Sequence, residues 1–255
     1  HQGTKLNTAG PPIPNLKPSM ASEEQLKMLR YMKQLDSGTN AEMEARIKSY
    51  ELAFRMQMSA PETLDISRES KATRDLYGEN RFSKQCLMAR RLVERGVRMV
   101  QVYNGCSSGD EWDTHHNNFK RHKKLMRIVD QGCAGLLADL KSRGMLEDTL
   151  VIWSGEFGRT PTTEKSHGRD HNPYGFCGWM AGGGVQGGQV IGATDEIGFR
   201  AAEDKVHVHD FHSTILKLMG LDHEELSVNQ NGLEMRLTDL YGYHDIYGKL
   251  TGRTS

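Results

Sequence analysis

Acidic and histidine side chains are concentrated in a few short segments after residue 100. Eight of the eleven histidines fall between residues 115 and 212, and carboxylates stand beside several of them. Carboxylate oxygens and imidazole nitrogens are together the ligands of zinc, manganese and similar divalent ions. The sequence therefore predicts a divalent metal site, with Zn, Mn or Ca as the candidate ions. The candidate ligands are Asp113, His115, Glu156, Asp170 and His171, with His209 as a weaker sixth.

Most of these residues also have a purely structural interpretation. Asp113 stands just before a predicted helix, where aspartate often caps the first turn. His209 lies at the start of another apolar helix and can cap it in the same way. Glu156 is harder to explain by packing, because it stands between glycines directly after an apolar run.

Two arginines stand beside the candidate ligands. Arg159 and Arg169 can each hold a tetrahedral anion through two parallel N–H donors, which makes them candidate substrate-binding residues. Either arginine can equally brace a loop by donating to backbone carbonyls. Both interpretations stay open from the sequence.

The elements that would position these residues are predicted from hydrophobic periodicity. Residues 97–103 alternate and are rich in β-branched side chains, which predicts a strand, and residues 119–140 carry an apolar stripe at helical spacing. Residues 149–153 form a short continuous apolar run, as expected for a strand buried on both faces. Strand, helix and strand in this order predict an α/β fold with a largely parallel sheet flanked by helices. Ligands of such sheets bind beyond the carboxyl ends of the strands, where Asp113 and Glu156 would follow.

The first 80 residues have a different character. Residues 1–20 are rich in proline, which predicts an extended loop, and residues 22–58 predict two charged, methionine-rich helices. Their methionines are either core-filling side chains or a partner-binding surface, and the first interpretation is the more common. We therefore expect a single α/β domain portion over residues 1–255, with a loop and an N-terminal helical segment over 1–80 and the strand–helix core over 81–255.

Charge balance and apolar content argue against two classes of function. Lys plus Arg and Asp plus Glu each number 33, so the general electrostatic attraction to nucleic acid is missing. No run approaches the roughly 20 apolar residues that a membrane-spanning helix needs. We therefore expect neither nucleic acid as a partner nor a membrane span. The four cysteines are scattered, without the close pairing of a zinc ribbon, and are predicted to be core thiols.

Three motifs carry a resemblance to a protein family. They are Trp112–His115 with Asn118, Gly155–Pro161 and Gly168–His171. Residues 86–98 and 208–216 are similar to further hallmarks of the same family. On these motifs the chain resembles an uncharacterised bacterial sulfatase-like family, labelled as a domain of unknown function, of the alkaline phosphatase superfamily. The resemblance spans roughly residues 1–240 and covers the C-terminal half of that superfamily's domain.

The resemblance implies a central sheet flanked by helices, with a two-metal site that hydrolyses or transfers phosphate or sulfate esters. It also implies that the attacking side chain lies in an N-terminal half, which an upstream segment or a second chain would supply. The substrate would be a small-molecule or glycan ester. The location would be periplasmic or extracellular, because members of the family are commonly exported.

The chain departs from the superfamily pattern at two places. Glu156 stands where an aspartate is expected, and Phe157 replaces the histidine that should follow it. His115 follows Asp113 by two positions, where the superfamily has a histidine four positions on. Two functions therefore stay open. The first is metal-dependent hydrolysis of sulfate or phosphate monoesters, and the second is a catalytically silent binding or structural protein that keeps the fold.

Overall fold

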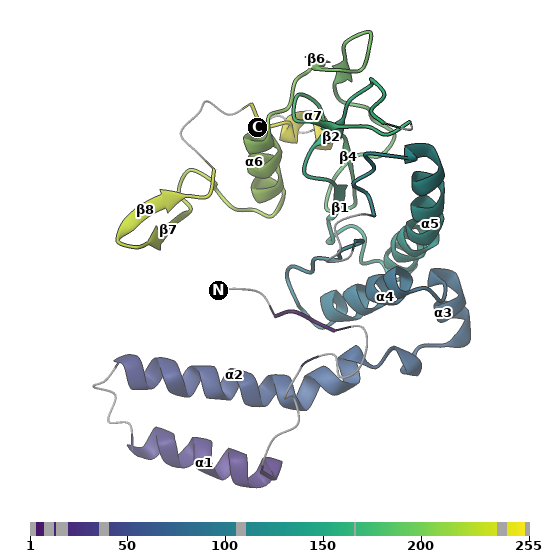
Figure 1. Ribbon diagram of the computed structural model, residues 1–255. Helices are drawn as coiled ribbons and strands as arrows, with labels where there is room; N and C mark the ends of the chain where they lie inside the picture. The colour runs from purple at the N-terminus through teal and green to yellow at the C-terminus, as the bar shows by residue number, and fades with distance from the viewer. Residues whose placement is uncertain are drawn as a thin grey trace. The chain divides into compact units, whose positions relative to one another are not determined.

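The computed structural model describes residues 4–7, 13, 20–35, 41–105, 111–165, 167–238 and 244–252. The chain divides into two compact units, whose elements are labelled in Figure 1. Unit 1 comprises His1–Tyr103 and Gln131–Gly135, and unit 2 comprises Asn104–Asp130 and Leu136–Ser255.

Unit 1 is helical wherever its described residues form regular structure. Its elements are α1 (Ser22–Leu35), α2 (Ala41–Leu64), the short 3-10 helix η1 (Ile66–Arg68), α3 (Lys71–Tyr77) and α4 (Arg81–Glu94). The two helices predicted within residues 22–58 are present. They run antiparallel, because Gln25 near the start of α1 donates to Gln57 at 2.9 Å, whereas Lys33 near the end of α1 pairs at 2.6 Å with Glu51, which lies nearer the start of α2.

The methionines of these two helices are more exposed than core-filling residues would be. Met28, Met43 and Met58 are 44%, 40% and 58% exposed. Leu29 of α1 and Ile47 of α2 are buried instead. The interpretation as core filler is therefore wrong for these three methionines.

The C-terminal end of α2 is held by a buried arginine pair from α4. The last carbonyl groups of a helix have no partner within it, and the last turn of α2 carries no basic residue. Arg91 supplies donors, with Nε 2.7 Å from the carbonyl oxygen of Thr63 and Nη2 2.7 Å from that of Glu62. Its fully buried neighbour Arg90 pairs with Glu69 at 2.9 Å, and Arg91 pairs with the same carboxylate. One carboxylate thus joins two buried arginines and the end of α2.

The long helix α5 (Asn118–Ser142) confirms the helix predicted over residues 119–140 and contributes one turn to unit 1. Within that turn, a Cβ at Gly135 would lie 2.9 Å from backbone atoms of Leu76 and Tyr77. The lack of a side chain therefore allows α5 to approach the buried end of α3 closely. Among the described residues, no helix combines the length and the apolar content needed to cross a membrane.

The cysteines differ in their surroundings. Cys86 is buried in α4, and this burial raises the pKa of its thiol to about 12. Cys133 is half-buried and Cys177 is exposed. The prediction of core thiols is thus confirmed for Cys86 and wrong for Cys177, while Cys106 lies outside the described residues.

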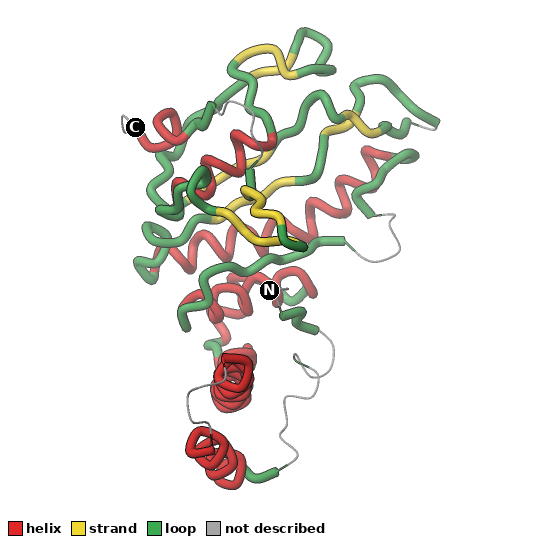
Figure 2. Tube along the Cα trace, turned by 90° about the vertical axis from the view of Figure 1, so that its left-hand side faces the viewer, coloured by secondary structure: helices red, strands yellow, loops and turns green. Residues whose placement is uncertain are grey.

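Unit 2 contains four pairs of short antiparallel strands among its described residues, drawn in yellow in Figure 2. The pairs are β1 (Val151–Ser154) with β4 (Gly178–Ala181), β2 (Gly158–Arg159) with β3 (His171–Asn172), β5 (Ala193–Thr194) with β6 (Ala201–Glu203), and β7 (Ser227–Gln230) with β8 (Leu233–Arg236). Most of α5 and the helices α6 (Val208–Leu218) and α7 (Tyr247–Thr251) are the helical elements of its described residues.

The predicted α/β fold with a largely parallel sheet, like that of alkaline phosphatases and sulfatases, is wrong. The strand predicted over residues 149–153 exists as β1, but it pairs antiparallel with β4 and places Ile152 opposite Met180. Residues 97–103 form no strand, and the side chains of Met99 and Tyr103 are 69% and 72% exposed. An alternating run becomes a strand only where another strand satisfies its backbone N–H and C=O groups. Periodicity does not reveal that partner.

The buried ion pairs of Glu69 lead to a stability prediction. Burial alone raises the pKa of Glu69, but hydrogen bonds from Arg90 and Arg91 outweigh it and hold this pKa below its ordinary value. We expect Glu69→Gln to lower the free energy of unfolding by about 3 kcal/mol near pH 7, because two buried arginines lose the carboxylate that they share, although Arg90 keeps another, Glu94 at 2.7 Å. Since the folded pKa is depressed, the stabilisation exists above the unfolded pKa and is lost as the pH falls below about 4.

Urea unfolding of both proteins at several pH values measures this difference. Glu23→Gln is the control, because Glu23 pairs with Lys27 on the exposed surface of α1 and contributes under about 1 kcal/mol. Equal loss of stability in the two variants would contradict the role given to Glu69.

Candidate metal centre

Two segments of unit 2 that are far apart in the sequence are joined backbone to backbone at the candidate site. One is the segment before α5, which includes Asp113 and His115, and the other leads into β3. The backbone N–H of Arg169 donates to the carbonyl oxygen of Thr114 at 3.0 Å, and that of Asn118 donates to His167 at 3.3 Å. Thr114 is fully buried at this junction. The junction therefore brings the residues on either side of Thr114 next to those that follow Arg169.

Gly168 allows this close approach. A Cβ at position 168 would overlap the carbonyl group of His115 and approach the backbone nitrogen of His116. Gly158 has a similar place in β2, where a Cβ would overlap the carbonyl oxygen of Gly175. Close backbone contact thus explains why glycine stands at positions 158 and 168 of the sequence motifs.

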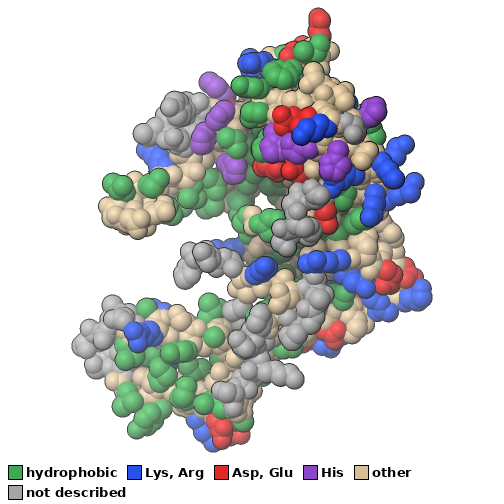
Figure 3. Space-filling model, viewed as in Figure 1, with side chains coloured by type: hydrophobic (Ala, Val, Ile, Leu, Met, Phe, Trp, Pro, Cys, Tyr) green, Lys and Arg blue, Asp and Glu red, His purple; other side chains and the backbone are tan. Residues whose placement is uncertain are grey.

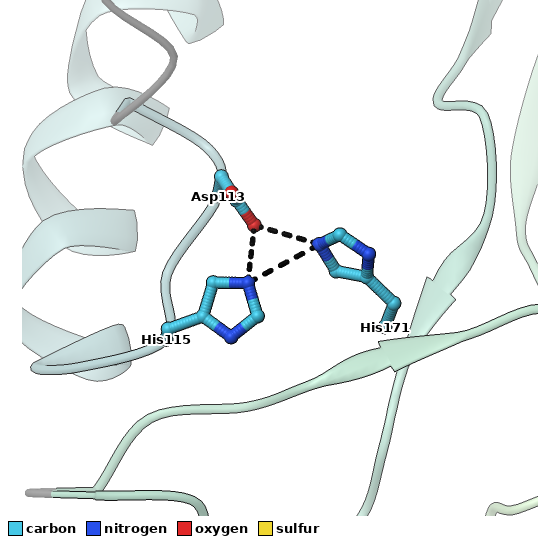
Figure 4. Close-up of side chains that lie close together, drawn as sticks. All are labelled: Asp113, His115 and His171. Carbon is cyan, nitrogen blue, oxygen red and sulfur yellow. Dashed lines mark hydrogen bonds and ion pairs between the residues drawn. The ribbon is translucent and has the colours of Figure 1, made fainter.

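Asp113, His115 and His171 form a compact triad (Figure 4). The Nε2 atoms of both histidines lie 3.0 Å from Oδ1 of Asp113, and they lie 3.2 Å from each other. The side chains of Asp113, His115 and His171 are 39%, 35% and 45% exposed, so the triad is reached from solvent. Figure 3 shows histidine, acidic and basic side chains gathered on the face in view. These carboxylate and imidazole groups lie near enough to each other to bind a metal ion.

A second group, of two carboxylates, lies on the other side of the His115 ring. The Nδ1 atom of His115 is 2.7 Å from Oε2 of Glu164 and 3.8 Å from Oδ1 of Asp170. The sequence analysis did not select Glu164. The sequence offers one signal for Glu164, its position in the short loop between two glycine-containing motifs. Its pairing with Gly168 forms only in the folded loop and leaves no pattern in the sequence.

Contacts within and beside the triad shift the pKa values of Asp113 and His115 in opposite directions. Hydrogen bonds from His171 and then from Arg159 lower the pKa of Asp113 to about 2, so this carboxylate is ionised at neutral pH. The hydrogen bond with Glu164 is the largest cause that raises the pKa of His115 above its ordinary value. A cation that binds at His115 Nε2 must therefore displace a proton more often than at an ordinary histidine.

The two arginines brace the site. Nη2 of Arg159 lies 2.8 Å from Oδ1 of Asp113, and Nη1 donates to the carbonyl oxygen of Arg169 at 3.3 Å. Arg169 donates to the carbonyl oxygen of Gly168 at 2.8 Å and lies 5.3 Å from the ring centre of Phe119. Of the two interpretations open from the sequence, these contacts correspond to loop bracing, and substrate binding by either arginine stays a prediction.

Aromatic and polar side chains contact the triad and the junction beside it. The ring of Phe157 lies 4.4 Å from that of His171 between centres, so this residue packs on a triad histidine. His122 lies edge-on to Trp112 at 5.4 Å, and burial lowers the pKa of His122. Its Nε2 is 3.3 Å from the hydroxyl of Thr114, at the junction of the two segments.

Two predicted ligands lie elsewhere. Glu156 is exposed in the turn after β1 and belongs to neither group. His209 lies in the first turn of α6, where its ring stacks on that of His207 at 5.0 Å and its backbone N–H donates to Nδ1 of His207. The structure therefore brings together Asp113, His115 and His171, places Asp170 next to His115, and leaves Glu156 and His209 apart.

Comparisons with known proteins bear on the family. A family model described as "Protein of unknown function (DUF1501)" matches residues 1–249. Searches of curated proteins and of solved structures gave no match. The expected membership in a sulfatase-like family of the alkaline phosphatase superfamily is wrong, because the matched model describes a distinct domain of unknown function.

The contact of Gly168 with His115 leads to a test of the junction. We expect Gly168→Ala to weaken zinc binding about tenfold or more, because the added methyl group pushes the loop of Asp113 and His115 away from His171. Gly187→Ala is the matched control, since a Cβ there meets no atom within 4 Å. Isothermal titration with Zn²⁺ measures the affinity, and circular dichroism checks that both variants are folded. Wild-type affinity in Gly168→Ala would show that the triad does not need this junction.

Proposed function

The chain belongs to the family described as "Protein of unknown function (DUF1501)", and from the geometry of the triad we propose that it binds a divalent metal ion and hydrolyses phosphate or sulfate monoesters. The observation that carries the proposal is the convergence of two imidazole nitrogens and one carboxylate oxygen from segments more than fifty positions apart in the sequence.

The separations between these atoms support a single ion. Metal–ligand bonds of about 2.1 Å place neighbouring ligand atoms about 3.0–3.4 Å apart in octahedral or tetrahedral coordination. The three separations in the triad are 3.0, 3.0 and 3.2 Å. Two imidazole nitrogens that approach one carboxylate oxygen so closely are arranged as ligands of one ion would be.

The donor types favour zinc or manganese over calcium. Calcium takes oxygen ligands, whereas imidazole suits zinc and the transition metals. Three protein ligands also leave positions open on the ion, which is typical of catalytic rather than structural zinc sites. An ion of this kind polarises an ester oxygen and activates water for attack.

The ester class rests on the charges around the triad. Arg159 places its guanidinium group against Asp113, and Arg169 directly precedes Asp170 in the chain. Guanidinium groups suit phosphate and sulfate oxygens. To bind an ester, Arg159 would exchange its contact with Asp113 for a contact with the anion. A small-molecule or glycan ester as substrate, and a periplasmic or extracellular location, stay predictions.

One observation favours the second candidate, a catalytically silent binding protein. Arg159 pairs with Oδ1 of Asp113, the oxygen on which both histidines converge, and already neutralises it. In that case the triad with Arg159 would serve to join the two loop segments.

Metal binding is the first test of the proposal. We expect one equivalent of Zn²⁺ or Mn²⁺ per chain, with a lower affinity for Ca²⁺ and weaker binding as the pH falls, because the imidazoles must be neutral to bind. Asp113→Ala and His171→Ala should each reduce zinc affinity at least about tenfold, since a three-ligand site loses one ligand. Exposed His116 stands next to His115 and is outside both groups, so His116→Ala is the control. Elemental analysis and titration measure stoichiometry and affinity. Wild-type protein that binds neither Zn²⁺ nor Mn²⁺ would overturn the proposal.

Hydrolysis is the second test. Aryl phosphate and aryl sulfate esters are incubated with the zinc- or manganese-loaded protein, and product release is followed by absorbance. We expect turnover of at least one ester class in wild type and in His116→Ala, and a loss of about a hundredfold or more in Asp113→Ala, as removal of a group that acts in the transition state causes. A protein that binds metal but turns over neither class would favour the silent alternative.

A further inference from the structure

The ring of His115 presents its two nitrogen atoms to different groups. Nε2 points toward Asp113 and His171, and the other ring nitrogen points away from them (Figure 4). That second nitrogen, Nδ1, lies 2.7 Å from the carboxylate of Glu164. One imidazole thus links the triad to a carboxylate outside it.

The contact suits the proton that His115 keeps when a metal ion binds its other nitrogen. Carboxylates accept hydrogen bonds, and one lies at each ring nitrogen, Asp113 at Nε2 and Glu164 at Nδ1, so in the absence of an ion the ring can donate from either side. When an ion takes the lone pair of Nε2, the ring keeps one N–H, on Nδ1, and Glu164 is placed to accept it. Histidine ligands in metal sites almost always donate their other N–H to such an acceptor.

The backbone holds Glu164 in place for this role. Glu164 and Gly168 exchange backbone hydrogen bonds, with the N–H of Glu164 3.0 Å from the carbonyl oxygen of Gly168. Gly168 in turn lies against the carbonyl group of His115. The loop that carries Glu164 is therefore tied to the backbone of the residue whose ring it contacts.

The same atoms could instead hold a second ion between His115, Glu164 and Asp170. Two distances argue against that arrangement. Asp170 Oδ1 is 3.8 Å from Nδ1 of His115, and the same oxygen accepts the backbone N–H of His171 at 2.7 Å. Glu164 makes the direct contact, while the carboxylate of Asp170 accepts the backbone N–H of the next residue, His171.

We propose that Glu164 is a positioning residue that holds His115 by a hydrogen bond from Nδ1, so that Nε2 faces the metal site. This inference rests on the proposed metal binding at the triad. Glu164 does not touch the ion; it acts through His115.

The test compares zinc affinity, stoichiometry and the Nδ1–H of zinc-bound His115 in three variants. Glu164→Ala removes the acceptor, and we expect a 10- to 100-fold weaker affinity with one ion per chain as in wild type. Glu164→Gln keeps an acceptor oxygen without its charge, and we expect a smaller loss. Glu196→Gln is the control, because Glu196 is exposed and lies outside both groups.

Nitrogen NMR of the imidazole rings in the zinc-loaded proteins supplies a readout that general destabilisation would not produce. We expect zinc at Nε2 of His115 and a slowly exchanging N–H on Nδ1 in wild type and Glu164→Gln, and faster exchange of this proton with solvent in Glu164→Ala, which lacks its acceptor. The absorption spectrum of bound Co²⁺ should shift in Glu164→Ala and stay unchanged in Glu196→Gln.

The possible failures are distinct. Wild-type protein that binds no ion overturns the metal site and this inference with it. Equal affinity and an equally slow exchange of the Nδ1–H in Glu164→Ala overturn the role of Glu164 alone. Two ions in wild type and one in Glu164→Ala would replace the positioning role with a second metal site bridged by His115.

Discussion

The candidate site depends on one backbone contact, between the carbonyl oxygen of Thr114 and the N–H of Arg169. Two candidate ligands flank Thr114, and two acidic or histidine residues follow Arg169 directly. This hydrogen bond, with the neighbouring one from Asn118 to His167, therefore aligns four functional side chains at once. It can form only because Gly168 has no side chain, so a glycine that does no chemistry determines where the chemistry can be.

The charges at this junction depend on one another. One oxygen of Asp113 contacts both histidines and Arg159, and the carboxylate of Glu164 contacts the other ring nitrogen of His115. Positive and negative groups that are partly exposed hold each other weakly. Such a network suits a site where an incoming ion or anion replaces one of the internal partners, because no deeply buried charge is left alone when a contact is exchanged.

Part of the site and of the fold could be predicted. Residue type and position selected Asp113, His115 and His171 together with Glu156, Asp170 and His209, because carboxylate and imidazole groups are ligands of divalent ions. The expected route was wrong, since the triad residues meet through a loop and an antiparallel hairpin and not at the ends of parallel strands. Glu156 was selected for its place after an apolar strand, and Glu164 was missed because its value comes from its backbone pairing with Gly168.

The sequence by itself determined the helices and the kinds of chemistry available. Helical periodicity and residue chemistry are local properties, so they identified α1, α2, α5 and a set of metal-binding side chains. The tertiary structure decided which segments pair, which methionines are exposed and which carboxylates reach His115. Strand pairing and ligand convergence join residues that are far apart in the chain, and their hydrogen bonds are specified by no pattern within either segment.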